Sequence, residues 1–304
     1  MSSGMMSFFN LNIMNASVSN KDVTPHFGRY ANILLDDWFK RTFVGGRDRK
    51  RLLLLFLREL IPDRSIETIS YGPQEAVNPN PRSKGIRLDI ECTDACGDRF
   101  LVELQRAPQN DFYQRAVFNS TFGVQRQIPS GDGYGFAPVY FIGIMDFSLH
   151  PDDDRFYYRY SLTENESGDL MTDRLNYIFL ELPKCGKDPK ASVLEKFGYA
   201  LHNMYRLENV PEGFEGEIFR LLFESAEIST FTPEEKLAYA EDMTTERDIR
   251  NQIAFARKEG RAEGRAEGAN QRNIEIARKM VSMKMDASVI SEATGLSKEE
   301  IATL

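Results

Sequence analysis

The chain has 304 residues and a formal net charge of −8, with 38 Lys and Arg residues against 46 Asp and Glu residues. Proteins that coat nucleic acid are usually basic, so this balance argues against a dedicated nucleic-acid-coating protein, although it permits a local basic groove around an acidic centre. No run of about 18 apolar residues is present, so no membrane-spanning helix is expected. Only three cysteines occur, which is too few for a disulfide framework and indicates a reducing, cytoplasmic compartment.

The first part of the chain divides into a tail and an α/β region. Residues 1–26 are rich in Ser, Asn and Met, and we expect a flexible N-terminal tail there. The spacing of apolar residues predicts a helix over 30–43, stopped by "GG" at 45–46. A second helix is predicted over 48–60, with Asp48 as its N-cap and its end before Pro62.

The next predicted elements alternate between strands and a helix, and this region, 27–186, is expected to be one α/β core. "SIETISY" predicts a first strand, "GPQEAVNPNPRSKG" a loop, and residues 87–105 a hairpin. A helix is predicted from Asn110, its N-cap, through "DFYQRAVFNSTFGVQRQI". The apolar run "VYFIGIMDFSL" is typical of a central buried strand, and "FYYRYSLT" and "LNYIFLELP" predict two more.

From about residue 187 the pattern turns helical. We expect a helical region over 187–250, and a helical linker with a short terminal helical hairpin over 251–304. In "GRAEGRAEG" glycine recurs every four residues, which either permits close contact with a partner helix, as in a homo-oligomer, or marks an exposed linker. In the hairpin, Asp286 is a candidate cap, Gly295 a stop, and Ser297 with Glu300 a capping box. This pattern is similar to half of a helix-turn-helix, for which DNA reading is the weaker interpretation.

The stretch "RLDIECTDACGDRFLVELQ", residues 87–105, places two acids face to face. If the turn is centred on Cys96, Leu88, Ile90 and Cys92 face Leu104, Val102 and Phe100 on an apolar side of the hairpin. The other side then pairs Asp89 with Glu103 and Glu91 with Leu101. Like charges directly opposite each other destabilise a sheet, so something is expected to offset this repulsion.

Three arrangements would offset it. The two acids can share a proton, they can pair with an arginine such as Arg87, or they can bind a hard divalent cation. Mg²⁺ favours one or two carboxylates together with waters and phosphate oxygens, and a cation held in this way polarises a phosphoryl oxygen. Gln105 lies two residues beyond Glu103 on the same strand, where its neutral amide can orient a water molecule. Asp36 is a candidate third acid, or the i, i+4 partner of Lys40.

The stretches "LDDWFKRTFVGG", "RLLLLFLRELI", "RLDIECTDACGDRFLVELQ", "FYQRAVFNSTFGVQRQIPSGDGY" and "PVYFIGIMDF" occur in this order. Together they resemble the recombination-promoting nuclease and transposase family of the PD-(D/E)XK nuclease superfamily, and the similarity extends into the "EGRAEG" tail. The resemblance implies a restriction-endonuclease-like α/β fold, with a mixed sheet flanked by helices and an all-helical C-terminal extension. It also implies metal-dependent endonucleolytic cleavage of DNA, with Mg²⁺ or another divalent cation as cofactor.

The resemblance also assigns residues. The D…ExK signature falls on Asp89, Glu103 and Gln105, with Asp89 and Glu103 as the metal ligands, and the family's helix motif places its acid on Asp36. Gln105 departs from the superfamily lysine, so a slow enzyme is expected. The alternative is a non-catalytic DNA- or protein-binding module that retains the nuclease fold. Basic residues available for phosphate binding, or for structural ion pairs, are Arg82, Lys84, Arg106, Arg115 and Arg126. The three histidines are expected to be isolated, with His150 in a solvated turn.

Overall fold

The computed structural model describes residues 28–72, 75–76, 86–109, 111–128, 133–188 and 190–304. The expected N-terminal tail therefore lies outside the described residues. The chain forms two compact units, Met1–Ser229 and Thr230–Leu304, and each is described by itself. No helix in the described part of the chain is long and apolar enough to cross a membrane.

The first unit is built on one mixed sheet. Its strand order is β1-β4-β5-β6-β8-β7, and β2 and β3 form a separate two-stranded sheet. The strands β5, β6 and β8 run parallel to one another, while β1, β4 and β7 are antiparallel to their neighbours. The strands are β1 (Ile69–Tyr71), β2 (Glu75–Ala76), β3 (Ile86–Arg87), β4 (Ile90–Asp94), β5 (Arg99–Gln105), β6 (Val139–Met145), β7 (Tyr157–Thr163) and β8 (Leu170–Glu181).

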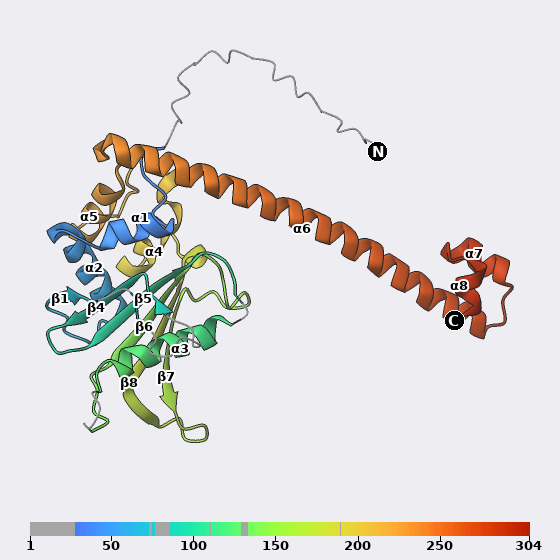
Figure 1. Ribbon diagram of the computed structural model, residues 1–304, viewed down its shortest axis with the longest axis horizontal. Coiled ribbons are helices and arrows are strands. Elements are labelled where there is room, and N and C mark those ends of the chain that lie inside the picture. The colour runs from blue at the N-terminus through green and yellow to red at the C-terminus, as the bar shows by residue number, and fades with distance from the viewer. Residues whose placement is uncertain (1–27, 73–74, 77–85, 110, 129–132, 189) are drawn as a thin grey trace, which may run out of the picture. The chain divides into compact units, whose positions relative to one another are not determined.

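Helices cover both faces of this sheet (Figure 1). The larger core packs α1, α2, α4 and α5 against one face, and a smaller core packs α3 against the other. The α-helices are α1 (Asp36–Phe43), α2 (Arg47–Leu60), α3 (Phe112–Gln125), α4 (Val193–Asn203) and α5 (Glu217–Ala226), and the 3₁₀-helices are η1 (Leu182–Lys184), η2 (Met204–Arg206) and η3 (Ile228–Thr230). The expected mixed sheet flanked by helices is thus confirmed.

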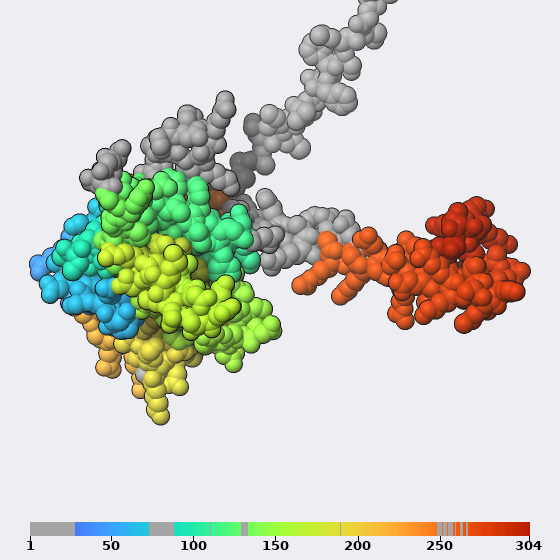
Figure 2. All heavy atoms as spheres, turned by 90° about the horizontal axis from the view of Figure 1, so that it is seen from below, coloured from blue at the N-terminus to red at the C-terminus, as the bar shows by residue number. Residues whose placement is uncertain are grey.

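The helix α3 also contacts the β7–β8 hairpin on this face of the sheet. Figure 2 shows α3 and this hairpin side by side on one face of the molecule. The Ser120 hydroxyl of α3 lies 2.9 Å from the Tyr177 hydroxyl of β8, and the ring of Tyr113 meets that of Tyr160 on β7 edge to face. Contacts from both the first turn and the later part of α3 therefore hold this helix against β7 and β8.

The predicted first helix is too long at its N-terminal end. The helix α1 begins at Asp36, whereas residues 30–35 are non-helical and buried. The Leu34 N–H donates to the Asn32 side-chain oxygen at 3.1 Å, a local bond that competes with the helical one. Tyr30 instead makes an isolated antiparallel bridge with Glu227. The apolar residues of this segment occur there because the whole segment is buried, not because they form one face of a helix.

The predicted caps of the next two helices also differ from the structure. The helix α2 begins at Arg47 with Gly46 as its N-cap, so Asp48 lies in its first turn rather than at the cap. Acidic side chains are favourable there because of the helix dipole. The helix α3 has Asp111 at its N-cap, and the predicted cap Asn110 lies outside the described residues.

The predicted hairpin register is confirmed for the paired residues of β4 and β5. Ile90 pairs with Val102, Glu91 with Leu101, Cys92 with Phe100 and Thr93 with Arg99. The predicted pairs Leu88–Leu104 and Asp89–Glu103 are not formed, because β4 begins only at Ile90 and the chain bends at Asp89. Leu88 therefore packs into the α3-side core, whereas Leu104 packs into the opposite one.

The second unit is entirely helical. The helix α6 (Pro233–Ser282) spans 50 residues and starts at a capping box formed by Thr232 and Glu235. The helices α7 (Ala287–Thr294) and α8 (Lys298–Ala302) follow, with Asp286 as the N-cap of α7 and left-handed Gly295 ending it, as predicted. The predicted capping box of Ser297 and Glu300 is also present. A small core joins Ala277 of α6 to Ile290, Leu296 and Ile301, so the end of α6 is the first helix of this terminal domain.

Candidate nuclease active site

Glu103 lies at the carboxyl end of the central strand β5 and faces α3. Its side chain is only 3% exposed. One carboxylate oxygen, Oε1, forms an ion pair with Nη2 of Arg115, and the other, Oε2, accepts a hydrogen bond from Nδ2 of Asn119 at 2.8 Å. Arg115 and Asn119 are four residues apart on α3, so one face of this helix supplies both partners. A buried carboxylate requires such compensation.

Asp89 lies at the bend just before β4. Its Oδ2 accepts a hydrogen bond from the backbone N–H of Leu104 at 2.8 Å, so the carboxylate sits against the backbone next to Glu103. Its Oδ1 lies 3.6 Å from Nζ of Lys40 on α1. Burial raises the pKa of Asp89, and the negative charge of Asp36 raises it further, although the Leu104 hydrogen bond and Lys40 oppose these effects. Asp89 therefore holds its proton to a higher pH than an exposed aspartate does.

Gln105 is the last residue of β5 and is buried. Its amide Nε2 donates to the carbonyl oxygen of Ala107 at 2.9 Å, and its Oε1 lies 3.4 Å from Nη1 of Arg115. The same Nη1 donates to Oε1 of Gln109 at 3.1 Å. Arg115 therefore contacts both residues that the ExQ signature places on β5.

Asp36 is the first residue of α1 and is exposed. Its negative charge raises the pKa of Asp89, although less than burial does. Its expected i, i+4 partner, Lys40, contacts Asp89 instead. The structure thus brings α1 to the open end of the β4–β5 hairpin, and Lys40, which the sequence suggested only as a partner of Asp36, contacts Asp89 there.

The other acid on this side of the hairpin, Glu91, belongs to a separate structural cluster. Its side chain is 1% exposed and its two oxygens pair with Arg99 at 3.1 Å and with Arg126 at the end of α3. Arg126, one of the residues considered for phosphate binding, is thus used in an ion pair. Because both of its oxygens are paired with arginines, Glu91 has the contacts expected of a buried acid with a structural role.

The remaining basic candidates divide between described and undescribed residues. Arg82 and Lys84 lie outside the described residues, and Arg106 follows β5 directly and is half-buried. Arg87 belongs to β3, where its backbone pairs with that of Glu75. Among the described side chains, Lys40 contacts Asp89 and Arg115 contacts Glu103, whereas the side chain of Arg87 lies outside the described part of the structure.

A second polar cluster surrounds Glu181, at the end of β8. Gln105, Met145 and Glu181 lie in register across β5, β6 and β8, so this cluster shares the sheet edge and the face of the ExQ signature. Glu181 is fully buried and contacts Ser148 Oγ at 2.6 Å, His150 Nδ1 at 2.5 Å and Lys184 Nζ at 2.8 Å. Burial alone would raise the pKa of Glu181, but these hydrogen bonds outweigh it and hold the pKa below its usual range.

The expectation of isolated histidines is wrong for two of the three. His150 binds Glu181 through Nδ1, and its Nε2 lies 3.0 Å from the hydroxyls of both Tyr113 and Tyr160. His202 Nδ1 contacts Asp146 at 2.6 Å. Sequence spacing did not reveal either contact, because the partners come from different strands and helices. Neither side chain touches the residues of the ExQ signature in the contacts described above.

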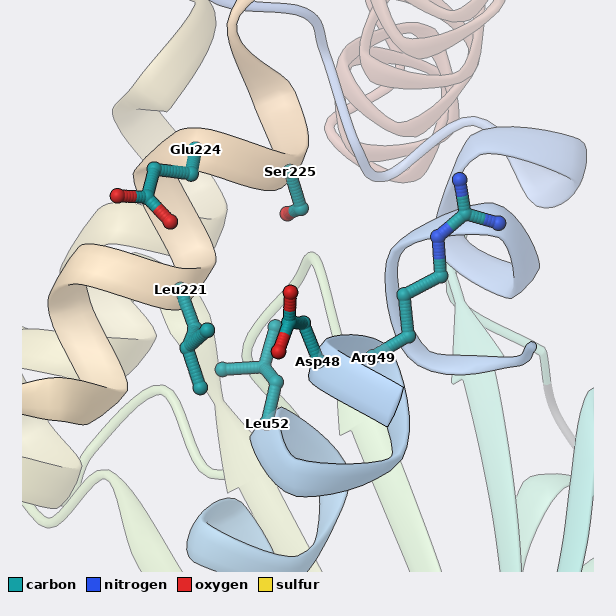
Figure 3. A pocket seen from close by; sticks show the side chains of 6 residues that line it. All are labelled: Asp48, Arg49, Leu52, Leu221, Glu224 and Ser225. Carbon is teal, nitrogen blue, oxygen red and sulfur yellow. The ribbon is translucent and has the colours of Figure 1, made fainter. Parts of the chain in front are cut away.

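A shallow pocket lies elsewhere in the first unit, between α2 and α5 (Figure 3). Its walls contain none of the four predicted site residues. They comprise Asp48, Arg49, Leu52, Leu221, Glu224 and Ser225. This pocket is therefore separate from the predicted site residues, which lie at the end of the β4–β5 hairpin and on α1.

The residues at the hairpin fit a hard divalent cation by the chemistry of their donors. One carboxylate comes from the bend just before β4 and the other from β5, and Asp89 has one oxygen 3.6 Å from its cationic neighbour Lys40. Within the described part of the chain, no group of three or more His, Cys, Asp or Glu side chains is gathered as a ready-made metal site. Asp89 and Glu103 would give a cation two carboxylates, which is the arrangement that Mg²⁺ uses together with waters and phosphate oxygens.

Comparison with known protein families gives two matches. Residues 34–256 match the family described as PD-(D/E)XK nuclease family transposase, and residues 270–304 match the Rpn/YhgA-like nuclease family, C-terminal HTH domain. Comparison with curated proteins and with solved structures yields no significant match. The first match covers α1 and every strand of the sheet, and the second covers the end of α6 with α7 and α8. The chain therefore belongs to the PD-(D/E)XK nuclease family transposases and ends in a helix-turn-helix domain of the Rpn/YhgA-like type.

Proposed function

We propose that this protein is a Mg²⁺-dependent DNA endonuclease that acts in recombination or on mobile elements. The observation that carries the proposal is the position of Asp89, whose carboxylate is bound to the backbone beside Glu103 at the open end of the hairpin. Burial and the negative charge of Asp36 both disfavour the ionised form of Asp89, and its cationic neighbour Lys40 lies 3.6 Å away, so a further cation at this position would be favourable. In a nuclease family, the cation expected at such acids is a divalent metal ion, which would take part in phosphodiester hydrolysis.

In this proposal the chain supplies ligands and position. Asp89 and Glu103 would hold the cation, which when bound would polarise the scissile phosphate and activate water. Gln105 would orient the attacking water through its amide, without taking up its proton. Lys40 places an ammonium group beside Asp89, where it would supply part of the positive charge that the superfamily lysine supplies and Gln105 cannot. A neutral residue at position 105 still predicts slow turnover.

The helix-turn-helix domain would contribute DNA contacts of modest strength. Its residues 270–304 contain equal numbers of basic and acidic side chains, so attraction to phosphate is not strong. The helix α8 starts with Lys298, Glu299 and Glu300, and Glu300 is used in the capping box. We therefore expect this domain to position the nuclease rather than to dominate affinity.

Plasmid nicking tests the proposal. Purified protein should convert supercoiled plasmid to the nicked form with Mg²⁺ or Mn²⁺ and not with excess EDTA. Asp89→Asn keeps an acceptor oxygen for the Leu104 N–H but loses the charge, and should lower nicking by at least about a hundredfold. The matched control is Glu91→Gln, an acid two residues away that is more deeply buried, with its side chain 1% exposed against 19% for Asp89, and that pairs with Arg99 and Arg126. Equal nicking by Asp89→Asn and wild type would remove the site assignment.

A second candidate function is a non-catalytic DNA-binding module. It is favoured by one observation, that both carboxylate oxygens of Glu103 already have protein partners, Arg115 and Asn119. This candidate predicts no nicking with any divalent metal. It also predicts gel-shift affinities that Asp89→Asn does not change and that removal of residues 257–304 abolishes.

A further inference from the structure

Arg115 occupies the place where the positive charge of a metal ion would be needed. Its guanidinium contacts the buried carboxylate of Glu103 through Nη2, and through Nη1 it reaches the side-chain oxygens of Gln105 and Gln109. In the described structure this arginine is the cation that compensates Glu103, and Asn119 supplies the remaining hydrogen bond. A divalent ion bound to Glu103 would compete with the guanidinium for the same carboxylate, and the two positive charges would repel each other.

We propose that Arg115 is a positioning residue that exchanges partners: it holds Glu103 until a divalent cation takes this carboxylate, and then turns to the phosphate of the bound DNA. The inference rests on the proposed nuclease function. It adds a residue that holds the Glu103 carboxylate in place before a metal ion binds. A guanidinium binds a carboxylate and a phosphate with the same two-pronged geometry, so both partners suit this side chain.

The surroundings of Arg115 permit this exchange. Its side chain is 37% exposed, whereas that of its carboxylate partner is 3% exposed, so the arginine rather than the glutamate has room to move. Its contacts with Gln105 and Gln109 are with neutral amides at 3.4 and 3.1 Å, and are easily replaced by water. Asn119 is buried and stays on Oε2, so Glu103 keeps its direction when Oε1 is released.

Arg126 provides a comparison within the same structure. It also pairs with a buried glutamate, Glu91, and it stands at the other end of α3. Glu91 has a second arginine, Arg99, so removing Arg126 leaves its charge compensated. Glu103 has one arginine and one amide. The two pairs thus share burial, charge and helix, but only the Arg115 pair lies on the ExQ signature.

Mn²⁺ titration of the full-length protein without DNA, followed by electron paramagnetic resonance of free Mn²⁺, tests the exchange. Arg115→Gln should bind Mn²⁺ about tenfold more tightly than wild type, because one positive charge a few ångströms from the ion has been removed. The same variant should nick plasmid at least about tenfold more slowly, because the phosphate loses its arginine. Arg126→Gln should change Mn²⁺ affinity less than twofold.

Opposite shifts in the two measurements are the signature of the exchange. An arginine with a purely structural role would leave Mn²⁺ affinity unchanged or lower it when removed, and either result would overturn the inference. Arg115→Lys covers the case in which Arg115→Gln does not fold, as judged by Trp38 fluorescence. It retains the charge but not the fork, so its Mn²⁺ affinity should stay within twofold of wild type while nicking falls. Nicking by Arg115→Lys at the wild-type rate would also overturn the inference.

Asp89→Asn separates this inference from the proposed function. If wild-type protein binds Mn²⁺ and Asp89→Asn does not, but Arg115→Gln is no tighter than wild type, the exchange fails and the nuclease proposal stands. If wild type shows no Mn²⁺ binding that depends on Asp89 and no metal-dependent nicking, both fail together.

Discussion

Gly143 lies in the middle of β6, paired with Glu103 on one side and Phe179 on the other, and it allows α3 to sit close to the sheet. A Cβ added at this position would lie 2.9 Å from Cζ of Phe112 and 2.9 Å from Cδ1 of Phe179. Both rings are buried and pack on each other with centroids 5.3 Å apart. Neither ring can turn away without displacing further aromatic side chains.

We therefore expect Gly143→Ala to destabilise the first unit. Overpacking of this kind costs about 1–3 kcal/mol, and the entropic benefit of alanine in a strand offsets about 0.5–1 kcal/mol of that, so the central values leave a net loss of about 1.3 kcal/mol. Phe112 begins α3, so its displacement would also move Arg115 and loosen the contact with Glu103.

Urea unfolding followed by Trp38 fluorescence measures this effect. Trp38 is the single tryptophan of the chain and is buried in α1, so it reports on the first unit. With a slope of about 2–3 kcal/mol/M, the midpoint should fall by about 0.5 M. The control is Gly264→Ala on α6, where an added Cβ meets nothing within 4 Å and the Trp38 transition should not move. An unchanged or higher midpoint for Gly143→Ala would refute the packing argument.

Two further predictions follow from ionisable groups. Asp89 must be ionised to bind a cation, and burial and the charge of Asp36 raise its pKa, so nicking should rise with pH through a limb above the ordinary aspartate value of about 3.9. Asp36→Asn should move this limb to lower pH in a pH–rate profile, and a shift to higher pH would contradict the assignment. Burial raises the pKa of Cys92 and of Cys185 to about 12, while Cys96 is exposed. Native protein should therefore react with Ellman's reagent at one thiol quickly and at all three only in urea, and fast reaction of more than one would show that the core is open.

The hairpin was predictable because its two faces differ in polarity. The alternation through Ile90, Cys92, Phe100 and Val102 allows a single register that buries the apolar side, and the structure shows this register. The alternation could not predict the bend at Asp89, which arises where the ladder is replaced by a side-chain bond to Leu104.

The partners of the acids were only partly predictable. Arg115 was named as a basic residue near the site, and Asn119 follows it by one helical turn, so spacing on α3 held a signal for both. Lys40 had no such signal, because its contact with Asp89 depends on how α1 packs on the sheet. The Glu181 cluster depends on the parallel order of β5, β6 and β8, which joins residues far apart in the sequence.

The segment between the two family matches, residues 257–269, contains the unit Gly-Arg-Ala-Glu in tandem within α6. Four residues advance an α-helix by about 6 Å and turn it by about 400°, a net rotation of about 40°. Inserting or deleting one unit would thus move the helix-turn-helix along the axis of α6 in a small screw step. Added side chains would meet no obstacle at Gly260, Gly264 or Gly268 among the described residues. The number of repeats therefore sets the distance and the rotation between the start of α6 and the helix-turn-helix. It does so without changing any residue of the nuclease fold or of the helix-turn-helix.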